Sequence, residues 1–121
     1  MEEAFANAAK ALYSVMVDLK NVRPGEQRDI TASGPDYEIL LVEWLNALLS
    51  ASDIERMVFS EFEVRIRRDA EAGLLLSGEV RGERLDPERH SARVEVKAAT
   101  LHMLRVERHA EGYIAQCVVD V

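Results

Sequence analysis

The apolar residues of this 121-residue chain change their spacing once, between residues 52 and 58. Over residues 2–20 and 39–49 they recur at intervals of three and four, the spacing that lines one face of an α-helix. From Val58 onward they alternate with charged residues, which is typical of a β-strand with one wet face. Helices followed by strands favour an α+β fold, with two helices packed on one face of a mostly antiparallel β-sheet.

The boundaries of the two helices have their own signals. Arg23-Pro24-Gly25 should end the first helix region, because proline disfavours the helical conformation of the residue before it. Weak alternation over residues 27–32 predicts a short strand at an exposed edge. Asp36 is the expected N-cap of the second helix, which should stop at residues 50–52. Because that helix is apolar around most of its circumference, it should be the more buried one.

The rest of the chain is predicted to be strands. Residues 58–67 and 74–81 should form a hairpin closed by a loop at residues 69–73. A polar connection follows at residues 82–91. Residues 94–108 and 113–121 should form two long strands joined by a turn at residues 109–112. The length of the chain and the lack of internal repeats predict a single domain, residues 1–121.

The charge of the chain bears on its partners. It has 22 acidic and 15 basic side chains and a formal net charge of -7, so its surface repels phosphate backbones. Direct nucleic-acid binding is therefore not expected, whereas a basic protein partner or a divalent cation fits. No apolar segment reaches the roughly 18 to 20 residues of a membrane span, and the acidic start does not resemble a secretory signal. A cytoplasmic protein is expected.

Signals for catalysis are lacking in the sequence. It contains no nucleotide-binding or hydrolase motif, and no nucleophile is paired with a base, so we do not expect an enzyme. The single cysteine, Cys117, stands beside Val118 and Val119. This context favours a small core residue in a reducing compartment over a nucleophile.

Asp120 and Val121 form the most informative polar pair. If Val121 ends the protein, the aspartate side chain and the terminal carboxylate are on adjacent residues, and hard divalent cations such as calcium prefer oxygen ligands of this kind. The alternative is a solvated, frayed chain end. The preceding apolar run should hold this end in a sheet.

Lys97 and His102 stand in an apolar, strand-like run. The lysine either faces water, as strict alternation predicts, or lines a site that holds an anion. His102 is either a hydrogen-bonded structural histidine or part of a site.

The segment from Asp86 to His90 also has two interpretations. Together with His102, its Asp86, Glu88 and His90 would make a loose metal-binding set, although the spacing matches no zinc pattern. A solvated turn is the other interpretation.

Motifs spread over nearly the whole chain resemble those of the archease family. None is decisive alone, but their order and spacing together are specific. They are Glu3 to Ala9, Val17-Asp18-Leu19, Leu41 to Asn46, Val58-Phe59, Gly82-Glu83, Asp86 to His90, Glu95 to Ala98 with Thr100 and His102, and Asp120-Val121.

This resemblance carries functional expectations. Archeases are small acidic α+β proteins that act as cofactors of the RtcB-type RNA ligase, which joins RNA ends in tRNA splicing and RNA repair using GTP and a divalent metal. It implies a non-enzymatic protein that promotes guanylylation of the ligase and its multiple turnover. It also implies a divalent-metal site, with calcium expected, at Asp120 and Val121. Lys97 matches a functionally important lysine, and His102 lies near the site. An alternative function is a chaperone-like protein-binding module.

The chain departs from the family pattern at its start. Archeases normally begin with a strand and a His-Thr-Ala-Asp segment whose aspartate binds the metal, whereas this chain starts directly in the first helix. A missing carboxylate is expected to weaken the metal site. A missing strand is expected to uncover a sheet edge that a second copy would pair with, which predicts a homodimer.

Overall fold

The computed structural model describes residues 1–71, 73–86, 90, 98–109 and 112–120, the last two ranges by their backbone. Its elements are, in chain order, α1 (Glu2–Met16), the 3-10 helix η1 (Leu19–Asn21), β1 (Glu26–Gly34), α2 (Tyr37–Glu55), β2 (Met57–Asp69), β3 (Gly73–Arg84), β4 (Ala98–His109) and β5 (Gly112–Asp120). The predicted α+β class is confirmed.

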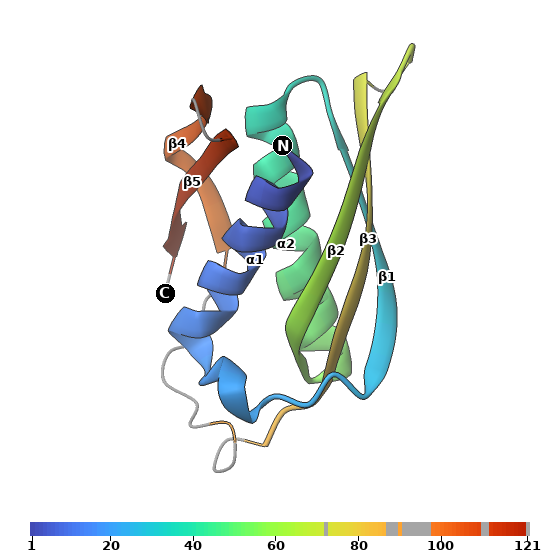
Figure 1. The fold of residues 1–121 in the computed structure, drawn as a ribbon, viewed down its shortest axis with the longest axis vertical. Coiled ribbons are helices and arrows are strands. Elements are labelled where there is room, and N and C mark those ends of the chain that lie inside the picture. Colours follow the sequence, from blue (N-terminus) through green and yellow to red (C-terminus); the bar gives the residue numbers. More distant parts are fainter. Residues whose placement is uncertain (72, 87–89, 91–97, 110–111, 121) are drawn as a thin grey trace.

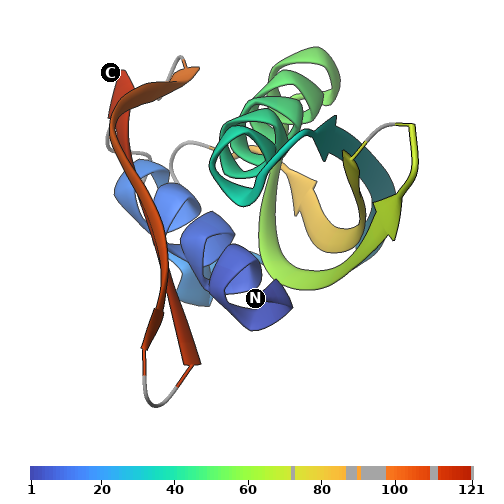
Figure 2. The same ribbon diagram turned by 90° about the horizontal axis from the view of Figure 1, so that it is seen from above.

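The described elements form three layers (Figure 1). Strands β1, β3 and β2 make an antiparallel sheet in that order, and α1 and α2 cover one of its faces, as predicted. The hairpin of β4 and β5 lies on the other side of the helices, with β4 against α2 and β5 against α1. Figure 2 shows the helices between the two sheets from above. Strands β4 and β5 thus form a separate two-stranded sheet.

One face of α1 packs into the core. Phe5, Ala9, Leu12 and Tyr13 are buried at helical spacing, and the small Ala9 lets its neighbours approach closely. The backbone carbonyl of Phe5 accepts a hydrogen bond from Trp44 Nε1 at 3.1 Å. This bond joins α1 to α2 inside the core.

The first helix is shorter than predicted. It ends at Met16 instead of near Lys20, because Val17 adopts an extended conformation with φ -146° and ψ 166°. Asp18 then begins η1, and its side chain accepts a hydrogen bond from the backbone N–H of Lys20 at 3.2 Å. The local cap of Asp18 competes with continuation of α1.

The second helix begins at the predicted cap. Asp36 Oδ1 accepts a hydrogen bond from the backbone N–H of Ile39 at 2.8 Å, a contact that stabilises a helix by about 1 kcal/mol. The prediction that α2 is the more buried helix is confirmed. Its buried residues are Leu40, Leu41, Val42, Trp44, Leu45, Leu48, Leu49 and Ser52.

The end of α2 lies beyond the predicted stop at residues 50–52. Ser52 continues the helix because its hydroxyl is hydrogen-bonded to the buried hydroxyl of Tyr13, which also contacts the carbonyl oxygen of Leu48 at 3.1 Å. The helix ends at Arg56, whose φ of 53° is left-handed. The helix therefore includes Ser52 and runs to Glu55.

A glycine lets α2 approach the sheet. Gly78 stands in the central strand β3, opposite Ile30 of β1 and Val64 of β2. A Cβ atom at Gly78 would lie 2.7 Å from two ring carbons of Trp44, which is fully buried. The indole therefore occupies the space that any other side chain at this position would need.

The two edge strands differ in their surroundings. β1 is an edge strand, as predicted for residues 27–32. At the other edge, the backbone N–H of Ile66 donates to Glu2 Oε2 at 2.7 Å, so the start of α1 covers part of β2. On β1, Arg28 forms an ion pair with Glu55 of α2, with Nε and Oε1 2.8 Å apart. A charged residue of this kind is common on natural edge strands.

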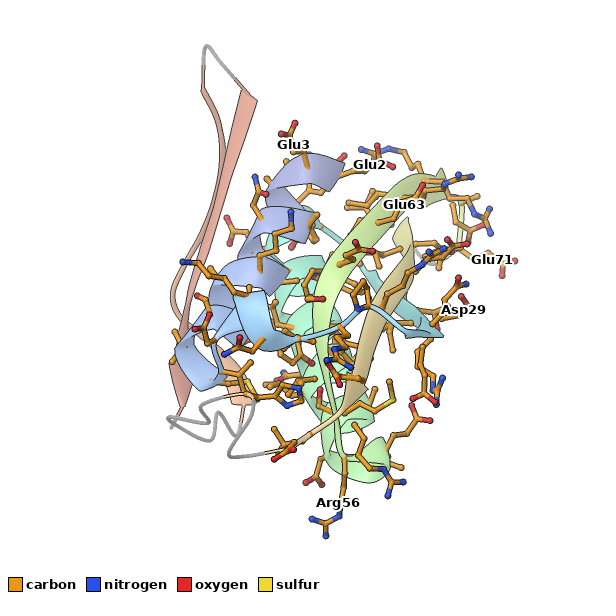
Figure 3. All side chains as sticks on the ribbon, turned by 60° about the horizontal axis from the view of Figure 1, so that its bottom comes forward. Glu2, Glu3, Asp29, Arg56, Glu63 and Glu71 are labelled. Atoms are coloured by element: carbon orange, nitrogen blue, oxygen red, sulfur yellow. The ribbon has the colours of Figure 1, made fainter. Side chains whose placement is uncertain are left out.

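The described surface is mainly polar. On the exposed face of the sheet, Glu79 of β3 pairs with Asp29 of β1 and with Glu63 of β2, so carboxylates run across the strands. Asp29 and Glu63 are labelled in Figure 3. The exposed large apolar side chains in the described part include Ile54, which is 77% exposed. Among the described residues, no helix has both the length and the apolar character to cross a bilayer.

Candidate functional site

The two stretches that carry the candidate residues meet at one end of the β4–β5 hairpin. Ala98 pairs with Asp120 in the antiparallel register. Lys97 directly precedes Ala98 in the sequence, and Val121 directly follows Asp120. The fold thus brings together two chain segments that the whole hairpin separates in sequence.

The candidate residues themselves are only partly described. Lys97 and Val121 lie outside the described residues, and Asp120 and His102 are described by their backbone. His102 lies in β4, where the register with β5 is irregular. The metal role of Asp120 and Val121 and the partner role of Lys97 and His102 therefore stay predictions.

His90 is fully buried, which makes the expectation of a solvated turn wrong for this residue. Its backbone N–H donates to the carbonyl oxygen of Asp86 at 2.8 Å, and its own carbonyl accepts from the N–H of Asp18 at 2.9 Å. The ring Nδ1 accepts a hydrogen bond from the backbone N–H of Asp86 at 2.9 Å. These bonds to backbone groups allow the polar residue to be buried.

The hydrogen bond to Nδ1 also determines which ring nitrogen carries the proton in the neutral imidazole. An accepting Nδ1 places the proton of the neutral imidazole on Nε2. Nε2 lies 3.4 Å from Glu83 Oε2 and has no hydrogen-bond partner within the described part of the chain. A buried N–H without a partner costs about 1–3 kcal/mol, and the adjacent carboxylate offsets part of this cost. With this tautomer, neither ring nitrogen offers a lone pair to a metal, so the structure does not support His90 as a ligand.

Glu83 connects this histidine to a second segment. Its Oε2 also accepts a hydrogen bond from the backbone N–H of Arg23, in the connection between η1 and β1. The preceding Gly82 allows a close strand approach, because a Cβ there would lie 1.8 Å from the carbonyl oxygen of Val58. Glu83 itself pairs with Val58, and the register of β2 and β3 shifts two positions further along β2, between Phe59 and Glu61.

The described side chains show no other candidate centre. They contain no group of three or more His, Cys, Asp or Glu residues that could hold a metal ion. A hollow of about 550 Å³ lies beside the end of α2 at Arg28, Glu55 and Arg56. A second hollow, of about 670 Å³, lies over Thr31 and Ser77 on the exposed sheet face. Neither lining includes a histidine or cysteine, so the described residues give no support for hydrolytic chemistry.

Two titratable groups with perturbed pKa values belong to the framework. Burial raises the pKa of the Tyr13 phenol, and its hydrogen bond with Ser52 opposes this shift. A hydrogen bond to Glu55 raises the pKa of Arg28, whereas desolvation lowers it. At neutral pH both groups keep their ordinary protonation state, so neither is poised as a general acid or base.

Comparisons with known proteins cover the whole chain. The Archease protein family matches residues 1–121. The archease of Sulfurisphaera tokodaii is 42% identical over 121 residues, which are 100% of this chain and 85% of the relative. The archease of Pyrococcus abyssi is 42% identical over 122 residues, again 100% of this chain and 85% of the relative.

Solved structures share the fold. The solution structure of Methanobacterium thermoautotrophicum protein 1598 has a TM-score of 0.76 at 36% identity and covers 97% of this chain and 84% of that one. An archease from Thermotoga maritima, described as a possible chaperone, has a TM-score of 0.57 at 15% identity, which shows the fold alone; it covers 95% of this chain and 79% of that one. The full-length match and the close relatives show that this chain belongs to the archease family.

Proposed function

We propose that this chain is a non-enzymatic cofactor of an RtcB-type RNA ligase, and that it promotes guanylylation and multiple turnover of the ligase in tRNA splicing and RNA repair. The observation that carries the proposal is membership of the archease family over residues 1–121. The register that pairs Ala98 with Asp120 supports it, because both candidate stretches then reach one end of the hairpin. A cytoplasmic location fits such a partner.

The proposal includes a divalent-metal site with Asp120 and Val121 as ligands and calcium as the expected ion. Calcium takes about six to eight oxygen ligands, which include carboxylates, carbonyl groups and water. The Asp120 carboxylate supplies about two, so Val121, water or groups of the partner would complete the shell. The bound cation would supply a fixed positive charge at this end of the hairpin.

Lys97 and His102 are proposed to act at the same end of the hairpin. Lys97 directly precedes Ala98, which pairs with Asp120, and its ammonium group would bind a phosphate or carboxylate of the partner; His102 follows in β4. The net charge of -7 disfavours direct binding of nucleic acid, so the RNA ends are assigned to the ligase.

A chaperone-like binding module is the second candidate. One observation favours it: Val15, Ile54 and Leu85 are large apolar side chains exposed at 44%, 77% and 38%. These residues come from α1, the end of α2 and the segment after β3. Exposed apolar patches that bind other proteins usually cover a few hundred Å² or more, and three side chains are weaker support than the family match.

A homodimer through strand pairing is also proposed. In the three-stranded sheet, Glu2 covers part of the β2 edge, whereas β1 at the other edge offers backbone groups for pairing. Light scattering over a wide concentration range should show dimers. A monomer at every concentration would contradict this part of the proposal.

A reconstitution separates the two candidate functions. Purified RtcB-type ligase is incubated with GTP and RNA ends, and covalent guanylylation and product per ligase are measured with and without this chain. The cofactor function predicts faster guanylylation and more than one turnover, both reduced when the chain is first stripped of metal by a chelator. An inert protein of similar size and charge is the control.

The same samples test the chaperone. That function predicts suppressed aggregation of unrelated heated clients without a metal requirement. It also predicts ligase stimulation no greater than that given by the inert acidic protein, an outcome that would reject the cofactor function.

A further inference from the structure

The hollow at the end of α2 lies outside the site proposed above. The start of β1 contributes Glu26 and Arg28 to its lining, the segment from α2 into β2 contributes Ile54 to Met57, and the end of β3 contributes Arg84. We refer to these seven residues as the α2-end corner. Its volume of about 550 Å³ is within the range of roughly 300–1,000 Å³ that is typical of binding pockets.

One of the three arginines in the corner is already paired within the protein. Arg28 Nε lies 2.8 Å from Glu55 Oε1, and its Nη2 lies 3.9 Å from Glu26 Oε2. Its Nη1 donates a hydrogen bond to the carbonyl oxygen of Gln27 at 2.8 Å. Arg28 therefore balances the carboxylates of the corner and has little capacity left for a ligand.

The other two arginines, Arg56 and Arg84, are exposed, and neither guanidinium forms an ion pair within the described part of the chain. Arg84 pairs with Met57 across β3 and β2, and the carbonyl oxygen of Arg56 accepts a hydrogen bond from the N–H of Leu85 at 2.8 Å. The backbone thus holds the two arginines as neighbours. Figure 3 shows Arg56 pointing away from the body of the protein, where a partner can reach it.

An apolar side chain accompanies these two cations. Ile54 lines the corner and is 77% exposed, more than the other exposed large apolar residues of the described surface, Val15 and Leu85. Met57 also lines the corner and is nearly fully buried. Because burial of an aliphatic side chain is favourable, a partner that covers Ile54 would gain free energy in addition to that of the ion pairs.

The backbone of Arg56 indicates that its side chain has a use. Its φ of 53° and ψ of 49° are left-handed, a conformation that glycine adopts at helix ends with less strain. A cation at a helix C-terminus also interacts favourably with the helix dipole, which would explain Arg56 alone. It does not explain why Arg84 and the exposed Ile54 stand beside it.

We propose that the α2-end corner binds an acidic segment of a partner protein, whose carboxylates pair with Arg56 and Arg84 and whose aliphatic side chain covers Ile54. The planar guanidinium group can bind a carboxylate through two parallel hydrogen bonds. A phosphate backbone is the poorer match, because Glu26 and Glu55 also line the corner and the net charge is -7. The proposal uses none of the residues assigned to ligase activation and does not depend on that function.

An NMR titration of the whole chain with a synthetic peptide tests this surface. The probe is a glutamate-rich peptide that carries leucines, and the backbone amide signals of the labelled protein report where it binds. We expect saturable shifts of the signals of Ile54, Arg56 and Arg84. The same peptide with serine in place of leucine should bind about tenfold more weakly, because it lacks the apolar contact. A lysine-rich peptide with the same leucines should leave these signals unshifted.

Substitutions separate binding from stability. Arg56→Gly removes the guanidinium and suits the left-handed backbone, so the variant should keep its stability in urea. Its affinity for the acidic peptide should fall about threefold, as for the loss of one partly exposed ion pair, and Arg84→Ala should have the same effect. Ile54→Ser should weaken binding about tenfold. Arg65→Ala and Val15→Ser are the matched controls, because they remove an exposed arginine and an exposed apolar side chain outside the corner, and both should bind as the wild type does.

Three results would overturn the proposal. The first is a wild-type chain whose corner signals do not move with the acidic peptide. The second is a folded Arg56→Gly that binds the peptide with wild-type affinity, and Arg84→Ala decides this point if Arg56→Gly fails to fold. The third is a single-stranded oligouridylate that shifts the corner signals while the acidic peptide does not, which would assign the corner to nucleic acid.

Discussion

Replacement of Gly78 by alanine tests how closely α2 packs on the sheet. The new Cβ would lie 2.7 Å from the Cζ3 and Cη2 atoms of Trp44, closer than real side-chain contacts allow. The indole is fully buried, and its Nε1 is tied to the carbonyl oxygen of Phe5 at 3.1 Å. The methyl group must therefore displace the ring, the strand or both.

The expected loss of stability combines three contributions. Overpacking of a close-packed core costs about 1–3 kcal/mol. Loss of the indole hydrogen bond would add about 1 kcal/mol. Alanine restricts the unfolded chain more than glycine does, which restores about 0.4–1 kcal/mol of stability. The free energy of unfolding should fall by about 2 kcal/mol, which for a chain of this size lowers Tm by roughly 6–10 °C.

Urea titration followed by circular dichroism and tryptophan fluorescence measures this change. Gly25→Ala is the matched control, because no atom lies within 4 Å of a Cβ at that position, and its stability should stay equal or rise slightly. Trp44→Phe should reduce the cost of Gly78→Ala, since the shorter ring leaves space for the methyl group. A Gly78→Ala protein as stable as wild type would refute the packing described here.

Three further predictions concern the cap, the core tyrosine and the metal site. Asp36→Ala should lower the free energy of unfolding in urea by about 1 kcal/mol, and an unchanged midpoint would show that the cap contributes nothing. Because burial raises the Tyr13 pKa, the unfolded state loses its phenol proton first, so stability should fall as pH rises above about 10. If the urea midpoint is measured at several pH values, the decrease above about pH 10 should be smaller for Tyr13→Phe than for the wild type. The same pH dependence in both proteins would show that the Tyr13 phenol does not cause the decrease. Asp120→Asn should weaken calcium binding at least tenfold in calorimetry, and wild-type affinity would exclude Asp120 as a ligand.

Local sequence patterns predicted the elements of the fold well. Helical spacing located α1 and α2, the Asp36 side chain marked the start of α2, and alternation located β2 and β3. These features depend on residues close in sequence, where periodicity and capping act directly. The ends of the helices were less predictable: Asp18 ended the first helix region early through its own cap, and Ser52 stayed helical through its bond to Tyr13.

Features that depend on distant residues were not predictable from the pattern. Among the described strands, β4 and β5 pair only with each other, and Ala98 aligns with Asp120. The alternation of residues along a strand predicts neither its partner nor its register. The burial of His90 depends on backbone groups of Asp18 and Asp86 and on the carboxylate of Glu83. The motif Asp86 to His90 was the available signal for this site, but its polar composition favoured a solvated turn.

The role of Lys97 in ligase activation is tested most directly by a comparison of Lys97→Ala with Lys10→Ala in the guanylylation assay. Lys10 is an exposed lysine on α1 and is not among the proposed site residues, so it controls for the loss of one positive charge. We predict that Lys97→Ala, folded with wild-type stability, stimulates guanylylation at least tenfold less than the wild-type chain, while Lys10→Ala keeps full stimulation. Equal stimulation by both variants would contradict the proposed role of Lys97.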